Sequence, residues 1–241
     1  MASTTAGRAT SSSLANRIDS LVNGVVLHWL LLFNLVFGAM VVIPWLAPIL
    51  MHLGAVQLAG LIYWVYGFLC HQLPERSWFL FGQHFAPNLA EIQRQSGAGT
   101  RLLELRQFIG NPEMGWKVAW SDRMVSFYGG YFLFSLTYVF VRRSRPKWRG
   151  LRWQVALLLL LPMVLDGISH TISDLWGIGA GFRDTNVWLA TLTVHSLSPS
   201  FYAGDAWGSF NSLARLATGL LAAGGLVFWL WPWADRLFKK V

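Results

Sequence analysis

Long apolar runs, separated by shorter polar segments, dominate the pattern of this 241-residue chain. A helix needs about 20 apolar residues to cross the ~30 Å hydrocarbon core of a membrane, and several runs approach that length. The pattern therefore predicts an all-α fold: a polytopic membrane helix bundle with about five transmembrane helices. The predicted spans cover residues 22–45, 53–71, 124–141, 153–171 and 212–231.

Prolines and segment length define the first two spans. Pro44 and Pro48 should end the first span, because proline cannot continue a helix interior. The second apolar run is short, and we extend it to 53–71 to reach a membrane-spanning length. Residues 1–20, rich in Ser, Thr and Ala, are interpreted as a mobile or surface-lying tail. The apolar stretch that follows is too long for the core of a cleaved signal peptide, so residues 21–241 form one transmembrane domain.

Composition and charge support a membrane protein and predict its orientation. Hydrophobic residues make up 54% of the chain and charged residues only 12%, against roughly 25% in a typical soluble domain. The net charge of +8 does not indicate nucleic-acid binding, because six of the 19 Lys and Arg residues lie between Arg142 and Arg152. A cytoplasmic loop facing anionic lipid explains that cluster. With five spans, the N-terminus is then outside and the C-terminus cytoplasmic.

The same topology leaves two long extracytoplasmic segments, 74–122 and 171–211. Residues 88–108 place Ile92, Leu103 and Leu105 near helical spacing, which predicts a short amphipathic helix on the membrane surface. The apolar part of 186–201 is too short to span, and we interpret it as an interfacial or re-entrant piece.

Polar residues of four predicted spans converge at the outer membrane level. Charged residues within a span normally face the bundle and find a partner there. Asp166 and His170, four residues apart, share one helix face. The sequence therefore predicts a single polar cluster at the extracytoplasmic helix ends. Its members are Cys70, His71, Glu75, Arg76, Arg123, Asp166, His170 and Arg215.

Each member of this cluster has a structural and a chemical interpretation. Cys70 with His71 could bind a metal, although adjacent residues make a weak metal motif, and a hydrogen-bonded histidine is favoured. For Glu75 and Arg76 a structural ion pair is favoured over catalysis. Asp166 and His170 are equally well explained as a base with its orienting partner or as a hydrogen-bonded pair within the bundle.

The arginines of the cluster have two interpretations as well. Arg123 and Arg215 could bind a lipid phosphate bidentately. Alternatively, they neutralise Asp122 and Asp166.

The segment Cys70-His71-Gln72-Leu73-Pro74-Glu75-Arg76-Ser77 resembles the signature of a family of small bacterial multi-spanning membrane proteins, domain of unknown function 2085. Further elements that resemble this family are 121–130, 162–167, 183–186 and 215–219. The resemblance covers roughly residues 45–225, adds Arg183 and Asn186 to the cluster, and implies a bacterial inner-membrane location. Ser121 and Met124 stand where the family carries cysteines. If those cysteines form a metal or redox site, this chain has lost most of its ligands.

Three functions are compatible with these observations. The favoured one is a non-catalytic binding or accessory subunit of a larger membrane complex, with membrane lipids and other membrane subunits as partners. No cofactor is predicted, and the ligand considered is a bound phospholipid. The alternative is a membrane enzyme or transporter for a lipid-linked or small anionic substrate, with Asp166 and His170 as acid and base and Arg123, Arg183 and Arg215 as phosphate clamps. The least favoured is a metal or haem site at Cys70, His71 and His170, because the Cys-x-x-Cys-His attachment motif is absent.

Overall fold

The computed structural model describes residues 4–238, with side chains from residue 16 onward. Within this range, four helices are long and apolar enough to cross a membrane. They are the Asn16–His52 part of α1 (Thr4–His52), the continuous helix Asp122–Ser144, α7 (Trp153–Asp174) and α11 (Phe210–Phe238). The helix Asp122–Ser144 consists of α5 (Asp122–Met124), a π-helical turn η2 (Val125–Gly129) and α6 (Gly130–Ser144). The predicted helical class is confirmed, and the four long apolar helices fit the predicted membrane protein.

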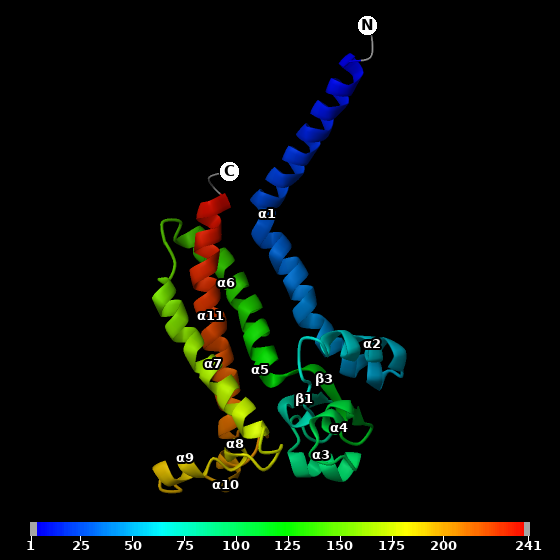
Figure 1. Cartoon of the computed structure of the whole chain (residues 1–241), viewed down its shortest axis with the longest axis vertical. Helices are drawn as coiled ribbons and strands as arrows, with labels where there is room; N and C mark the ends of the chain where they lie inside the picture. The colour runs from blue at the N-terminus through cyan, green and yellow to red at the C-terminus, as the bar shows by residue number, and fades with distance from the viewer. Residues whose placement is uncertain (1–3, 239–241) are drawn as a thin grey trace.

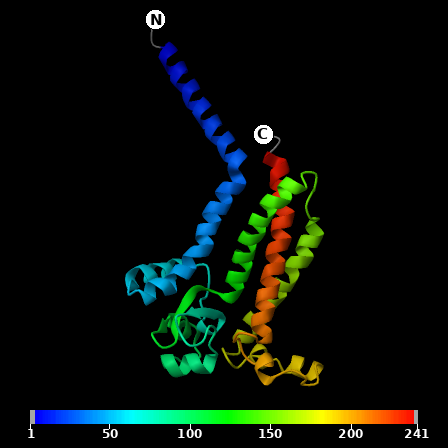
Figure 2. The same ribbon diagram turned by 180° about the vertical axis from the view of Figure 1, so that it is seen from behind.

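Small residues on α11 allow it to pack closely between α6 and α7 (Figures 1 and 2). A Cβ atom added at Gly219 would lie 2.1 Å from the Ser126 Oγ, and one at Gly225 would lie 2.9 Å from the Leu159 Cβ. Helices in a membrane associate through such close contacts, since the surrounding lipid is as apolar as they are.

The predicted second span, 53–71, differs from the structure. Its helix α2 (Val56–Tyr66) has only 11 residues and lies across the end of α1 (Figure 1). Ala59, Tyr63 and Tyr66 are buried, whereas Leu58 and Trp64 are largely exposed. The apolar run that suggested a span therefore belongs to a short helix with one buried and one exposed apolar face.

α1 is longer than predicted at both ends. It continues through Pro44 and Pro48 to His52, so the prediction that these prolines end the helix is wrong. Pro44 is fully buried, and this part of α1 packs against β3 and α2, which holds the helix together across the missing N–H donors. At the other end, residues 4–20 of the predicted tail are helical, whereas residues 1–3 lie outside the described residues.

A small sheet, which the sequence did not predict, occupies the first long segment. β1 (Ser77–Leu80), β3 (Gly115–Ser121) and β2 (Gly110–Asn111) pair antiparallel in the order β1-β3-β2. Around it lie the 3₁₀ turn η1 (Pro74–Arg76), α3 (Leu89–Ser96) and α4 (Leu102–Gln107). The single surface helix predicted within 88–108 is thus two short helices, which pack onto a core of their own. That core contains Leu73, Phe79, Ile92, Leu105, Met114 and Ile178.

The second long segment folds beside this sheet. It forms three short helices, α8 (Phe182–Thr185), α9 (Val187–Leu192) and α10 (Pro199–Tyr202). Residues 67–121 and 175–209 together are called the cap here. Figure 1 shows the cap at one end of the bundle, and the start of α1 and the end of α11 at the other. The predicted arrangement placed the two chain ends on opposite sides, whereas the start of α1 and the end of α11 lie at the same end of the bundle.

Candidate functional site

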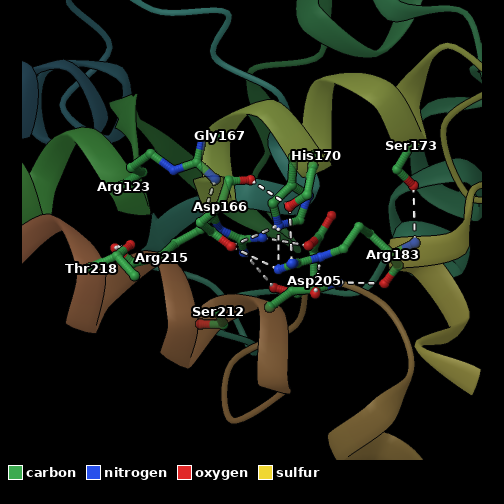
Figure 3. Close-up of polar contacts among 12 residues, drawn as sticks. Arg123, Asp166, Gly167, His170, Ser173, Arg183, Asp205, Ser212, Arg215 and Thr218 are labelled. Atoms are coloured by element: carbon green, nitrogen blue, oxygen red, sulfur yellow. Dashed lines mark hydrogen bonds and ion pairs between the residues drawn. The ribbon is translucent and has the colours of Figure 1, made fainter. Parts of the chain in front are cut away.

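Charged side chains from the long helices and the cap meet in one network at the junction between them (Figure 3). Its ion pairs form two groups, which the hydrogen bond from the Arg123 N–H to Asp122 Oδ1 connects. Four arginines and four aspartates form the network, so its formal charge is balanced. Six of the eight side chains are buried, and the other two are less than a fifth exposed. The members are Arg76, Asp122, Arg123, Asp166, Asp174, Arg183, Asp205 and Arg215.

Arg215 is the centre of this network. Its Nε donates to both oxygens of Asp122 at 2.8 and 2.9 Å, and its Nη2 donates to Asp122 Oδ2 at 2.7 Å. Its Nη1 donates to Asp205 Oδ1. Since Asp122 begins the second of the four long helices, Arg215 belongs to α11 and Asp205 belongs to the cap, this one guanidinium joins two long helices to the cap.

Arg76 makes the second connection between the cap and the bundle. Its two Nη atoms each donate to one oxygen of Asp174 at 2.7 Å, and its Nε donates to Asp205 Oδ2 at 2.8 Å. Burial alone would lower the pKa of Arg76, but Asp205 and Asp174 hold it well above its usual value. Burial would likewise raise the pKa of Asp205, yet Arg76 and Arg215 hold it well below its usual range.

Asp166 accepts hydrogen bonds from two arginines, at 2.7 Å from Arg123 and 2.8 Å from Arg183 (Figure 3). The Nε2 of His170 is 3.9 Å from the nearer Asp166 oxygen, whereas Arg183 Nη2 lies 3.1 Å from that nitrogen. Arg183 is therefore placed between the two residues that the sequence suggested as a base and its orienting partner. A direct hydrogen bond between Asp166 and His170 is not made.

Two asparagines close the network on the cap side. Asn211 Oδ1 accepts from Arg183 Nε and from Asn186 Nδ2, both at 3.1 Å. Asn186 also donates to the carbonyls of Arg183 and Tyr202. Its φ of 44° lies in the left-handed region that asparagine tolerates, so this residue turns the chain between α8 and α9 and fixes Arg183.

Cys70 and His71 adjoin the network without a metal-binding arrangement. The Cys70 Sγ accepts from the backbone N–H groups of Gln72 and Ser121 and lies 3.4 Å from the Ser121 Oγ. The His71 Nδ1 accepts from the Leu73 N–H at 3.1 Å, and burial lowers the pKa of His71 to about 3, so the ring is neutral. Among residues 16–238, no group of three or more His, Cys, Asp or Glu side chains is placed to hold a metal ion.

Glu75 does not form the ion pair with Arg76 that the sequence suggested, because the Arg76 guanidinium instead donates to Asp174 and Asp205. Glu75 is only 3% exposed, and neither of its carboxylate oxygens has a hydrogen-bond partner among the described residues. Burial raises the pKa of Glu75 to about 7, against the opposing charges of Arg76 and Lys117. Glu75 also lines a cavity of about 500 Å³ in the cap.

The sequence predicted most members of this network but not all of them. The ten predicted cluster residues all lie in the network or directly beside it. Asp174, Asp205, Asn211 and Lys117 were missed. Asp174 follows Asp166 and His170 at the same four-residue spacing, so that periodicity could have revealed it. Lys117 is fully buried in β3, and its Nζ donates to the carbonyls of Gln72 and Arg106 at 2.8 Å each.

These features define a helical protein whose four long apolar helices are compatible with a multi-pass membrane protein, and whose folded cap is fastened to one end of the bundle by buried ion pairs. Comparison with protein-family models, with curated proteins and with solved structures finds no match.

Proposed function

We propose that this protein is a non-catalytic binding or accessory subunit of a complex in the bacterial cytoplasmic membrane. The observation that carries the proposal is the mutual pairing of the four arginines and four aspartates. A phosphate clamp or an acid–base pair needs groups that face a substrate. Here Arg123, Arg183 and Arg215 already donate to carboxylates. The network thus supports a rigid connection between the cap and the bundle.

The ion pairs suit a connecting role for a physical reason. Bidentate arginine–carboxylate pairs fix the relative orientation of the groups that they join, and their removal from water is offset only when every partner is present. A cap held in this way keeps its outer surface in a constant position relative to the membrane. Such a surface suits the binding of a partner subunit or ligand.

We further propose that the cap is extracytoplasmic and that both chain ends are cytoplasmic. The basic segment 142–152 runs from the last turn of α6 to the start of α7, at the end of the bundle opposite the cap, and basic loops stay in the cytoplasm. Cys70 is the only cysteine and is buried, so a cysteine introduced at the surface would be the only accessible site for a thiol reagent. In intact cells, a membrane-impermeant maleimide should label Gln83→Cys in the cap, and should label Ser144→Cys only after permeabilisation. The reverse labelling pattern would reject this orientation.

The accessory function can be tested on the full-length protein taken from its membrane in mild detergent. Native mass spectrometry should detect the chain together with another membrane subunit. A photo-crosslinking residue at Trp207, which is 54% exposed in the cap, should give a discrete protein adduct in cells. The matched position Leu158, 66% exposed on α7, should give lipid adducts. A strictly monomeric, lipid-free protein with no adduct at Trp207 would contradict the proposal.

A further inference from the structure

A groove lies between α1 and α6, near the end of the bundle opposite the cap (Figure 1). Its volume is about 580 Å³, which lies within the range of small-molecule sites. Most of its walls are apolar side chains of the two helices: Leu27, Leu30, Leu31, Leu136 and Val139. Leu27, Leu31 and Leu136 are exposed, although both helices are apolar enough to cross a membrane. The groove therefore opens toward the space that lipid would occupy.

Basic side chains stand at one end of this groove. Arg142 and Arg143 lie in the last turn of α6, and His28 lines the groove from α1. Among the described residues, no acidic side chain lines the groove. The segment 142–152, which begins here, contains six Lys or Arg residues and no Asp or Glu. The groove thus combines apolar walls with a positively charged end.

The two arginines differ in what they already contact. Arg142 Nε lies 3.1 Å from Asp235 Oδ2, and the Asp235 carboxylate also accepts from the Tyr138 hydroxyl and the Trp29 Nε1. Asp235 therefore ties α1, α6 and α11 together beside the groove and positions the Arg142 guanidinium. Arg143 is exposed and forms no ion pair within residues 16–238. Its positive charge is available to an anion.

We propose that this groove binds an anionic phospholipid, with the headgroup phosphate at Arg142 and Arg143 and an acyl chain along the apolar walls. Guanidinium groups bind phosphate oxygens strongly, and basic pockets between membrane helices hold anionic lipid headgroups. A soluble phosphate would use only the charged end of the groove, whereas a phospholipid uses both parts. The site lies at the opposite end of the bundle from the cap and needs no partner subunit, so it goes beyond the proposed function.

The test uses the purified full-length protein in mild detergent, titrated with dioleoyl phosphatidylglycerol and followed by native mass spectrometry. Dioleoyl phosphatidylcholine, which has the same chains and no net charge, should bind about fivefold more weakly or worse. Arg143→Gln should weaken phosphatidylglycerol binding by about fivefold, the factor that one basic residue contributes beside anionic lipid. Lys147→Gln is the matched control, because it removes the same charge from an exposed position of the same loop that does not line the groove. It should bind like the native protein.

A second pair of variants tests the apolar walls without changing any charge. Leu136→Trp would fill part of the groove and should weaken phosphatidylglycerol binding by about fourfold or more, the factor for one acyl methylene group kept out of an apolar site. Leu133→Trp, at a 61% exposed position on the same helix that does not line the groove, should leave the affinity unchanged.

Four outcomes would overturn this site. Equal losses in Arg143→Gln and Lys147→Gln would show diffuse attraction to the basic loop. Equal affinity for the two lipids would show that the charged end plays no part. An unchanged affinity in Leu136→Trp would place the lipid outside the groove. Displacement of the lipid by inorganic phosphate would assign the charged end to a soluble anion.

The same spectra separate this inference from the proposed function. A bound lipid and a bound protein subunit differ widely in mass, so each is detected independently of the other. Lipid binding without any partner subunit would leave the site standing and remove the accessory role.

Discussion

Replacing Arg215 with methionine is expected to destabilise the folded protein by about 3–5 kcal/mol, the range found when one partner of a buried ion pair is removed. Arg215 is 2% exposed and makes three hydrogen bonds to Asp122. Methionine fills a similar volume but leaves Asp122 without its ion-pair partner and removes one of two arginines from Asp205. Thermal and denaturant unfolding in detergent, followed by tryptophan fluorescence, would measure the loss.

Three further variants show whether this effect comes from the network. Arg215→Lys keeps the charge but loses the planar double contact, so its stability should be intermediate. In the double variant Arg215→Met with Asp122→Asn, the orphaned charge is gone, and the loss should be smaller than the sum of the two single losses. Arg101→Met removes an exposed arginine that lies 3.7 Å from Glu104, and should change stability by less than about 1 kcal/mol. Equal losses in Arg215→Met and Arg101→Met would show that the network does not stabilise the fold.

The meeting of polar residues at one membrane level could be predicted because it depends on local facts. Helix ends follow from apolar length, and Asp166 and His170 share a face because a helix has 3.6 residues per turn. Which arginine meets which aspartate could not be predicted in this way. Arg76 and Arg215 are both bound to Asp205, which lies in a loop whose position depends on how the whole cap folds.

The short helix α2 and the sheet could not be predicted for a different reason. A short apolar run is equally compatible with a buried strand, a half-exposed helix and part of a span. α2 has one buried face and one exposed apolar face, and hydropathy does not distinguish this from a helix that crosses. The strands have four, two and seven residues, too short for a periodic signal. The path of α1 through Pro44 was also unpredictable locally, because packing against β3 and α2 supports it.

The Glu75→Gln variant is expected to be more stable than the native protein at pH 8 and nearly equal to it at pH 4.5. The pKa of Glu75 is raised from an ordinary 4.5 to about 7 by burial. Between pH 4.5 and about pH 7, the Glu75 carboxyl group has lost its proton in the unfolded chain but keeps it in the folded protein. The free energy of unfolding of the native protein therefore falls as pH rises from 4.5 to 7. The total loss caused by Glu75 is about 3 kcal/mol and stays constant above pH 7.

This gain in stability distinguishes a buried carboxylate without a partner from one that forms a stabilising ion pair. Glutamine carries no charge to desolvate, so the difference in melting temperature between the two proteins should grow from pH 4.5 to 7 and then stay constant. His71, whose pKa burial lowers, is present in both proteins and largely cancels in that difference. Lys117 changes with the variant, because burial lowers its pKa and the Glu75 charge opposes that shift. A loss of stability at pH 8 would instead show that Glu75 stabilises Arg76, as the sequence alone suggested.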